Sequence, residues 1–229
     1  MKNFKFHPKN KNVEELVVAP QPSKLYYPNW MKLMQKQWTA SNGKIRLTAT
    51  GCAPFTDSFT YGYTQELPYD INLTFDENKN TVIIDHEDQK HLFISQRGDV
   101  EGMPNMLPQF DGFYNIEFSW ESAWEPITPK GYSTLYTHPL NRPDLPFYTF
   151  SGIIDTDSWS IPGPITFIVK KGFQGTIPKG TPIAQMIFIK RDDWNSTILK
   201  FDESIIKKQS NDIIDSSYKK KIWTRKNFY

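Results

Sequence analysis

The sequence predicts a mainly β protein, with its strands in a jelly-roll or β-clip barrel, a short N-terminal helix and a C-terminal helix. Short segments alternate apolar and polar residues at the period of a half-buried strand, for example residues 45–49 and 71–75. Turn-forming Gly, Pro, Asn and Asp separate such segments, as at residues 76–80. Aromatic residues make up 15% of the chain, so bulky rings would supply much of the buried area. Short strands with turns between them favour a closed or sandwiched β architecture.

The length of 229 residues suits one domain with tails. We predict an extended N-terminal arm at residues 1–29, a single β domain at residues 30–191 and a helical tail at residues 192–229. Prolines in the arm favour extended backbone in the residues before them. Residues 28–38 predict a short amphipathic helix, whose apolar stripe we interpret as core packing rather than a partner surface. The stripe has four large residues at helical spacing: Trp30, Leu33, Met34 and Trp38.

Within the β domain, several further segments have the pattern of a strand. They are residues 44–50, 71–75, 81–85, 91–95, 113–122, 132–137, 165–172 and 185–191. The second and third of these flank a strong turn signal, so we expect them to form a hairpin. Residues 86–112 contain a long loop rich in Gly, Pro and Met, and loops of this length are usually functional or mobile.

The C-terminal tail has the pattern of a helix. Asp202 is a candidate N-cap, and the basic run Lys219–Lys221 would suit the negative pole of the helix dipole at the other end. We interpret this run as a solvated helix end rather than a nucleic-acid contact. Apolar pairs lie about two helical turns apart: Ile205 with Ile206, and Ile213 with Ile214.

Charge and cysteine content exclude several classes of protein. Lys and Arg total 27 against 25 Asp and Glu, and a formal charge of +2 does not indicate a nucleic-acid or membrane surface. Cys52 is the only cysteine, so no intrachain disulfide or cysteine-based zinc cluster can form. Residues 1–12 lack the apolar segment of a secretory signal, and no apolar run is long enough to span a bilayer. We therefore expect a soluble intracellular protein that is not secreted and binds neither membranes nor nucleic acid.

One group of potential metal ligands occurs in the sequence: His86, Glu87, Asp88 and His91. The spacing of the two histidines places them together on neither a helical face nor a strand face. We interpret the group as a solvated turn and predict no metal site. No cofactor is expected, and Mg²⁺ would be needed only if the protein were a nucleotide hydrolase.

Three motifs follow one another in the central third: ITPKGYSTLYTHP at residues 127–139, GIIDTD at 152–157 and IPKGTPIAQMIF at 177–188. In this order they resemble the C-terminal half of the dUTPase and dCTP deaminase superfamily. There a Pro-Gly-Tyr turn leads to an Arg-Ser motif, a Gly-x-Ile-Asp motif and a Gly-Asp-x-Ile-Ala-Gln strand. The resemblance covers about residues 127–190. It implies a β-clip or jelly-roll barrel, often trimeric, with nucleotide bound at subunit boundaries, so a homo-oligomer such as a trimer is expected.

The segments HPLNRPDLP at residues 138–146, GIIDTD and IPKGTPIAQ also resemble an uncharacterised protein family encoded by bacteriophages. This resemblance covers the chain as a whole. It implies a phage protein in the host-cell cytoplasm or the virion, and it implies no activity.

Asp155 matches the aspartate that orients a water molecule and reads the deoxyribose in the superfamily, so the resemblance implies a catalytic base there. A carboxylate held by the turn at Gly152 on a rigid strand is able to act as a base when it faces a substrate. The alternative weighs more heavily: Asp155 and Asp157 cap a turn, a role that suits short polar side chains.

The phosphate-binding part of the superfamily pattern is altered in this chain. Its Arg-Ser pair falls at His138 and Pro139, and proline has neither a hydroxyl nor an amide hydrogen. Arg142 is a candidate replacement for the lost positive charge. The expected tyrosine is Ser158, with Trp159 one place later, and the Gly-rich tail that covers the phosphates is absent. A deaminase would also need a glutamate base near the Gly-x-Ile-Asp motif, and none stands there.

Asp155 is therefore the candidate catalytic residue, and the candidate ligand-binding residues are His138, Asn141, Arg142, Asp144, Asp157, Trp159 and Gln185. Gln185 is as consistent with a structural role as with ligand contact, and Arg142 could instead pair with Asp144 on the surface.

Three functions stay open. The first is a phage accessory protein that binds a nucleotide, a similar small ligand or a protein partner without efficient catalysis. The second is a virion or assembly component that uses the barrel as a scaffold, with its arm and C-terminal helix docking neighbours. The third is a nucleotide pyrophosphohydrolase with rearranged phosphate ligands.

Overall fold

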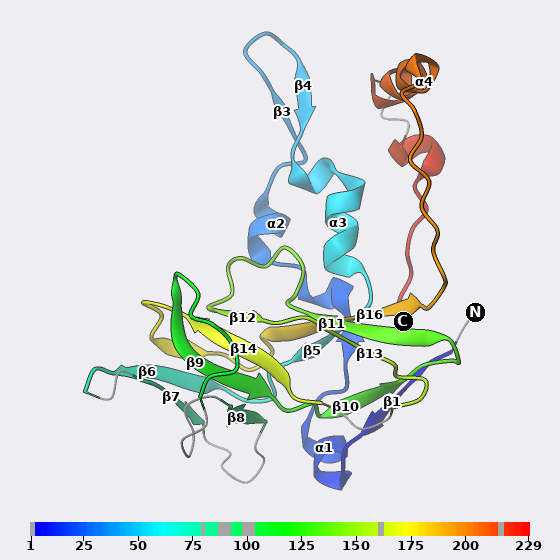
Figure 1. Ribbon diagram of the computed structural model, residues 1–229. Coiled ribbons are helices and arrows are strands. Elements are labelled where there is room, and N and C mark those ends of the chain that lie inside the picture. The colour runs from blue at the N-terminus through cyan, green and yellow to red at the C-terminus, as the bar shows by residue number, and fades with distance from the viewer. Residues whose placement is uncertain (1–2, 79–80, 87–92, 98–103, 160–162, 215–217) are drawn as a thin grey trace.

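The computed structural model describes residues 3–78, 81–86, 93–97, 104–159, 163–214 and 218–229. Within these residues strands outweigh helices, so the predicted mainly β class is confirmed. The strands pair in an antiparallel manner and form separate sheets, and no sheet built from the described residues closes into a barrel. Figure 1 shows the larger sheets gathered in the body of the molecule, with two prongs that rise from one side, one of which carries the small β3–β4 sheet.

The largest sheet has five strands in the order β13-β11-β16-β5-β2. Their bounds are Gly152–Ile154 (β13), Tyr132–Thr137 (β11), Pro182–Lys190 (β16), Tyr63–Glu66 (β5) and Gln21–Pro22 (β2). β16 is the central strand of this order, and its residues from Pro182 to Met186 are therefore buried on both faces. It pairs with β11 so that Thr137 stands opposite Gln185, which brings two of the sequence motifs together.

Two further sheets complete the body: one of four strands, β12-β14-β9-β8, and one of three, β15-β6-β7. Their bounds are Phe147–Thr149 (β12), Ile165–Lys170 (β14), Phe113–Trp120 (β9), Ile94–Gln96 (β8), Gly175–Ile177 (β15), Ile71–Asp76 (β6) and Thr81–His86 (β7). The predicted hairpin of residues 71–75 and 81–85 is confirmed, since β6 and β7 pair along their whole length. The predicted strands at residues 113–122 and 165–172 are also present, each ending slightly earlier.

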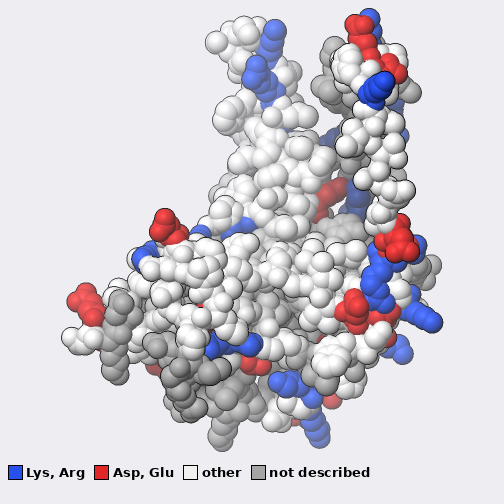
Figure 2. All heavy atoms as spheres, in the orientation of Figure 1, with Lys and Arg blue, Asp and Glu red and all other residues white. Residues whose placement is uncertain are grey.

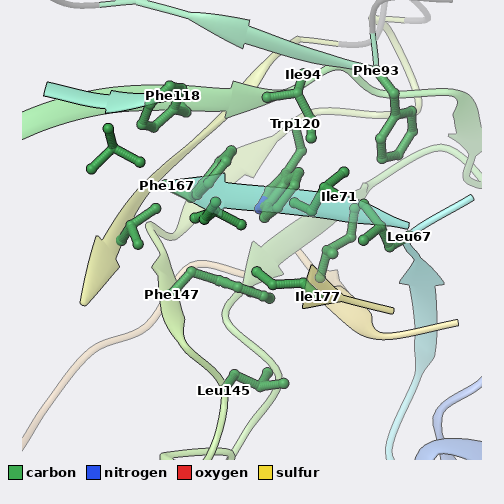
Figure 3. Close-up of a cluster of buried hydrophobic side chains, with 14 of the residues drawn as sticks. Leu67, Ile71, Phe93, Ile94, Phe118, Trp120, Leu145, Phe147, Phe167 and Ile177 are labelled. Atoms are coloured by element: carbon green, nitrogen blue, oxygen red, sulfur yellow. The ribbon is translucent and has the colours of Figure 1, made fainter. Parts of the chain in front are cut away.

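The main core lies among these sheets and is built from rings and branched side chains (Figure 3). The Trp120 indole stacks on the Phe167 ring, with ring centroids 3.6 Å apart. Both side chains are buried, and the indole Nε1 donates to Thr149 Oγ1 at 3.0 Å. This bond satisfies the one polar group of a buried indole. Aromatic residues therefore supply much of the core packing, as their abundance predicted.

The N-terminal segment adds short elements to the edge of the body. β1, Lys5–Pro8, pairs with β10, Trp124–Ile127. α1, Lys11–Leu16, follows with Asn10 as its N-cap, because the Asn10 side chain accepts from the Val13 N–H at 2.9 Å. A 3₁₀ turn, η1, occupies Ser23–Tyr26. The strand pairing depends on residues far along the chain, so local pattern gave no sign of it.

The first prong carries a β-hairpin. β3, Gln37–Thr39, pairs with β4, Ile45–Leu47, and these two strands form a sheet of their own. The predicted strand at residues 44–50 is therefore shorter than expected, and its alternating side chains are exposed rather than half-buried. An alternating pattern favours a strand, but burial needs a second layer, and no described residues cover this hairpin.

The helix predicted at residues 28–38 is also shorter. α2 spans Asn29–Leu33, and Trp38 lies in β3 instead. The interpretation of its apolar stripe as core packing is wrong for Leu33, which is 85% exposed, and for Trp38, which is 68% exposed.

Helical turns follow the hairpin, between the predicted strands at residues 44–50 and 71–75. A 3₁₀ turn, η2, occupies Ala49–Gly51, and α3 spans Ala53–Thr60. Pro54 suits the first turn of α3, where a missing N–H costs no intrahelical bond.

The second prong is formed by the C-terminal segment. Residues 192–202 leave β16 as an extended chain with no regular structure, and α4 spans Glu203–Ile214. The predicted N-cap is confirmed, since the Ser204 N–H donates to Asp202 Oδ1 at 2.8 Å. The basic run Lys219–Lys221 was predicted to end this α-helix, but it lies in a π-helical turn, η3, at Tyr218–Ile222.

No helix among the described residues combines the length and apolar character needed to cross a bilayer.

Candidate functional site

The predicted site residues fall into two groups at opposite ends of strand β11. Asp155 contacts Ser133 near the N-terminal end of the strand, and His138 follows its C-terminal end. At about 3.3 Å per residue, Ser133 and His138 are roughly 16 Å apart. The candidate base and the candidate phosphate ligands therefore do not share one cleft.

Asp155 belongs to an ion-pair network with Arg191. Asp155 Oδ1 accepts from Ser133 Oγ at 2.7 Å and lies 3.0 Å from Arg191 Nη1. Arg191 Nη1 also donates to Ser133 Oγ at 3.0 Å and to the Tyr132 carbonyl at 3.1 Å. The carboxylate thus joins the turn after β13 to the residue that follows β16. Its side chain is 60% exposed, so solvent weakens this ion pair.

Asp157 is held more firmly in the same network. The Gly131 N–H donates to Oδ2 at 2.7 Å, Ser158 Oγ donates to Oδ1 at 2.9 Å, and Arg191 Nη2 pairs with Oδ2. The hydrogen bond from Arg191, followed by that from Gly131, lowers the pKa of the Asp157 carboxyl far below its usual range. Asp157 is therefore ionised at neutral pH, with its oxygens already bonded within the turn. Trp159, two residues later, is 56% exposed.

His138 is enclosed by backbone hydrogen bonds. Its Nε2 lies 3.0 Å from the Arg142 carbonyl oxygen, and its Nδ1 accepts from the Thr149 N–H at 3.3 Å. These contacts fit the neutral ring with its proton on Nε2. Burial lowers the pKa of His138 below its ordinary value. The imidazole is therefore uncharged at pH 7 and does not replace a phosphate-binding arginine.

Arg142 forms a forked ion pair with Asp144. Its Nε donates to the two carboxylate oxygens at 2.9 Å and 3.1 Å, and its Nη2 donates at 2.8 Å. Its Nη1 donates to the Tyr26 carbonyl at 3.3 Å. Burial would raise the pKa of Asp144, but the hydrogen bonds and charge of Arg142 outweigh burial and lower it. Arg142 also lines a groove of about 520 Å³ beside residues 176–182, with its charge already paired.

Asn141 and Gln185 fix the loop after β11 against α3. Asn141 has φ 58°, in the left-handed region that Asn tolerates, and its Nδ2 donates to Ser58 Oγ at 2.7 Å. Gln185 is 2% exposed, accepts from the Leu140 N–H at 2.9 Å, and donates to the carbonyls of Ser58 and Tyr61 at 2.9 Å and 2.6 Å. These bonds use the acceptor and both donors of the Gln185 amide, so its contacts are structural.

The potential metal ligands Glu87, Asp88 and His91 lie outside the described residues. Among the residues that the structure does describe, no group of three or more His, Cys, Asp or Glu side chains is placed to hold a metal ion.

A pocket of about 380 Å³, here called the aromatic pocket, lies next to the Arg191 network. Seven of its eleven lining residues are Phe or Tyr. They come from separate parts of the chain: Phe4 before β1, Tyr63 on β5, Tyr132 on β11, Phe188 on β16 and Phe228 near the C-terminus, together with Tyr61 and Tyr229. The volume lies within the range of small-molecule sites.

The rings of the aromatic pocket pack against one another. The Phe4 ring centroid lies 4.9 Å from that of Tyr63 and 4.3 Å from that of Phe188, and Phe228 lies 5.9 Å from Tyr63. Tyr63 Oη donates to the backbone oxygen of Tyr229 at 2.7 Å, which fixes Tyr229 beside the pocket. No Asp, Glu, Lys or Arg lines the described pocket. A flat uncharged ligand fits this lining better than a phosphate does.

The sequence did not lead us to this pocket, because two of its walls come from the segments assigned to the arm and the tail. Phe4 and Phe228 stand near opposite ends of the chain. The sequence marks these residues only by the aromatic side chains that occur near both Phe4 and Phe228, in segments that are usually polar.

No family model matches the sequence, and no curated protein matches it.

Proposed function

We propose that the protein is a binding protein without efficient catalysis, and that it holds a flat, uncharged ring in the aromatic pocket. A nucleobase or nucleoside, or a small ligand of similar shape, is the class we favour. The observation that carries the proposal is the pocket lining, in which seven aromatic residues meet and no charged side chain takes part. Stacking a base on an aromatic side chain contributes about 1–3 kcal/mol, so several rings give useful affinity without any phosphate contact.

Weak or absent catalysis is part of the same proposal. The carboxylate of Asp155 is engaged by Ser133 and Arg191, and Asp155 does not line the aromatic pocket. A pyrophosphohydrolase would need cationic groups or metal ions at the phosphates. Arg142, the residue that the sequence offers as a phosphate-binding cation, is paired with Asp144 at the other end of β11. The β-clip or jelly-roll arrangement and the bacteriophage setting remain parts of this proposal that rest on the resemblance.

Thermal-shift measurements with nucleosides and with deoxynucleoside triphosphates, each with and without Mg²⁺, test the proposal. We expect nucleosides to raise Tm at millimolar concentration, and neither the triphosphate nor Mg²⁺ to add to the shift. Tyr132→Ala should remove the shift because it removes a ring from the pocket wall. Tyr148→Ala, at a tyrosine outside the lining, is the matched control and should keep it.

Three results would count against this function. Absence of a shift with any nucleoside would refute the choice of ligand, and an unchanged shift in Tyr132→Ala would refute the choice of pocket. Stabilisation only by triphosphate with Mg²⁺, together with measured pyrophosphate release that Asp155→Ala abolishes, would establish the hydrolase instead.

A second candidate function is that of a virion or assembly component that uses the β body as a scaffold. The two prongs favour it, because they carry exposed large apolar side chains, and Figure 1 shows both prongs projecting from the body. In that case the homo-oligomer expected from the sequence would be the working form of the protein.

A further inference from the structure

The C-terminal prong exposes an unusual amount of apolar surface. Four large side chains on its extended segment are almost entirely in solvent: Trp194 at 90%, Ile198 at 98%, Leu199 at 77% and Phe201 at 82%. Single exposed apolar residues are normal on a protein surface, but a contiguous run like this marks an interaction site.

The backbone of the same segment is unpaired as well. Residues 193–201 belong to no helix or strand, and no backbone hydrogen bond joins them to any other described residue. Unpaired N–H and C=O groups on an extended chain are a template for adding a strand to another sheet edge.

The segment is held away from the body at both of its ends. Before it, the Arg191 N–H donates to the Gly131 carbonyl at 2.8 Å. After it, Trp223 Nε1 and Lys226 Nζ donate to Asp57 Oδ2 at 2.8 Å and 2.6 Å. The prong is therefore attached to the body at both of its ends, and the apolar side chains of its extended segment do not pack against the body.

The hairpin prong, residues 29–51, has open strand edges and exposed apolar side chains. β3 and β4 pair only with each other among the described strands, so each has an open edge. Trp38, Ile45 and Leu47 on these strands are 68%, 62% and 59% exposed. An isolated two-stranded hairpin is at best marginally stable in water, so a third strand along one edge would stabilise it.

The two prongs also differ in charge. Residues 29–51 carry no Asp or Glu and four basic residues: Lys32, Lys36, Lys44 and Arg46. Residues 192–203 carry one lysine and four acidic residues: Asp192, Asp193, Asp202 and Glu203. Figure 2 shows only basic charged side chains on the hairpin prong, and both acidic and basic ones at the tip of the other prong. The acidic residues beside the extended segment thus suit the basic hairpin of a second copy, and Figure 1 shows the two prongs standing apart on the same side of the molecule.

We propose that the protein forms a reciprocal dimer in which residues 193–201 of each copy add a strand to the β3–β4 hairpin of the other. A two-fold axis between the prongs places each hairpin, which has basic residues only, against residues 193–201, where Asp193 and Lys200 cancel and Asp192, Asp202 and Glu203 lie directly beside the strand. The same surface of each copy then faces the other, as in an isologous interface. The proposal does not depend on ligand binding, and it gives the assembly role its partner, a second copy of this chain.

The available surface is sufficient for a stable interface. The seven exposed apolar side chains of the two prongs offer on the order of 1,000 Å² per copy, judged from the usual areas of such residues. A standard specific interface buries about 800 Å² per partner. The dimer would therefore remove this apolar surface from water without any change in the body.

Size-exclusion chromatography with multi-angle light scattering on the full chain is the first test. We expect a mass near twice the chain mass of 26.7 kDa. Ile45→Asp on the hairpin and Leu199→Asp on the C-terminal prong should each weaken the dimer at least 100-fold while leaving the circular dichroism unchanged, because both positions are exposed. Leu16→Asp is the matched control, since Leu16 is 59% exposed on α1, away from both prongs, and should leave the mass unchanged.

Mixing the two variants tests reciprocity. A mixed dimer of Ile45→Asp with Leu199→Asp concentrates both defects in one half of the interface and keeps the other half intact. It should therefore form more readily than either variant with itself. A wild-type monomer at 100 µM or a trimer would overturn the reciprocal arrangement, and so would a dimer that tolerates both substitutions. Lack of protection from hydrogen exchange at residues 193–201 in the dimer would refute the added strand.

Discussion

Gln185 offers the sharpest test of how the loop after β11 is held, and this loop carries four of the eight candidate residues. Its amide joins the Leu140 N–H to the carbonyls of Ser58 and Tyr61, so one side chain ties β16, the loop after β11 and the end of α3. Gln185→Leu keeps the size and apolar stem but removes all three hydrogen bonds. Leaving a buried donor or acceptor unsatisfied costs about 1–3 kcal/mol, and the three groups here are partly buried. We expect a total loss of roughly 3 kcal/mol in the free energy of unfolding.

Urea denaturation at one fixed protein concentration measures this loss, and a fixed concentration matters because association would add its own stability. Gln174→Leu is the matched control, since Gln174 is exposed, and it should change stability by less than about 0.5 kcal/mol. A loss of about 3 kcal/mol corresponds to a fall in Tm of roughly 6–12 °C for a chain of this length. If Gln185→Leu is no more destabilising than Gln174→Leu, the three hydrogen bonds of the Gln185 amide do not hold the loop.

Two further predictions concern a backbone contact and a buried imidazole. Gly62→Ala should abolish folding or cost more than about 3 kcal/mol, because Gly62 has φ 81° and an added Cβ would lie 2.1 Å from the Met186 carbonyl oxygen. Gly43→Ala, at φ 76° but with open space around it, should cost only about 1 kcal/mol in the same urea assay, and equal losses would contradict the steric argument. Burial lowers the folded-state pKa of His138, so the unfolded chain binds the proton more tightly and stability should fall as pH drops below the unfolded value of about 6.5. His138→Gln should flatten this slope between pH 7.5 and pH 5 in urea titrations, and an unchanged slope would show that other groups cause it.

The sequence predicted the elements whose partners lie close by along the chain. The hairpin of β6 and β7, the strands β9, β11 and β14, and the cap at Asp202 all follow from alternation or capping within a few residues. Where the prediction failed, a distant contact was missing or decisive. Ile45 and Leu47 alternate as core residues do, yet no described layer covers their hairpin, and residues 53–60 form α3 between two segments predicted as strands.

The candidate site was harder to predict because function depends on which distant residues meet. Two of the motifs meet where Thr137 on β11 stands opposite Gln185 on β16, but the Gln185 amide bonds to the backbone of Leu140, Ser58 and Tyr61. Asp155 bonds to Ser133 near the start of β11, and His138 directly follows the end of the same strand. Their separation along the strand becomes visible only in the structure. No periodicity in the sequence links Phe4 with Phe228, although both contact Tyr63.

The aromatic pocket and the C-terminal prong meet at one place in the chain. Trp223 and Lys226 bond to Asp57, where the prong returns to the body, and Phe228 enters the pocket two residues after Lys226. A partner that fixes the prong would therefore also restrict the segment that forms one wall of the pocket, and coupling of this kind acts equally in both directions. The two proposals nevertheless rest on different residues, because neither Ile45 nor Leu199 lines the pocket. Loss of dimerisation in their aspartate variants would leave the rings in place, so a failure of the dimer proposal would not by itself refute nucleoside binding.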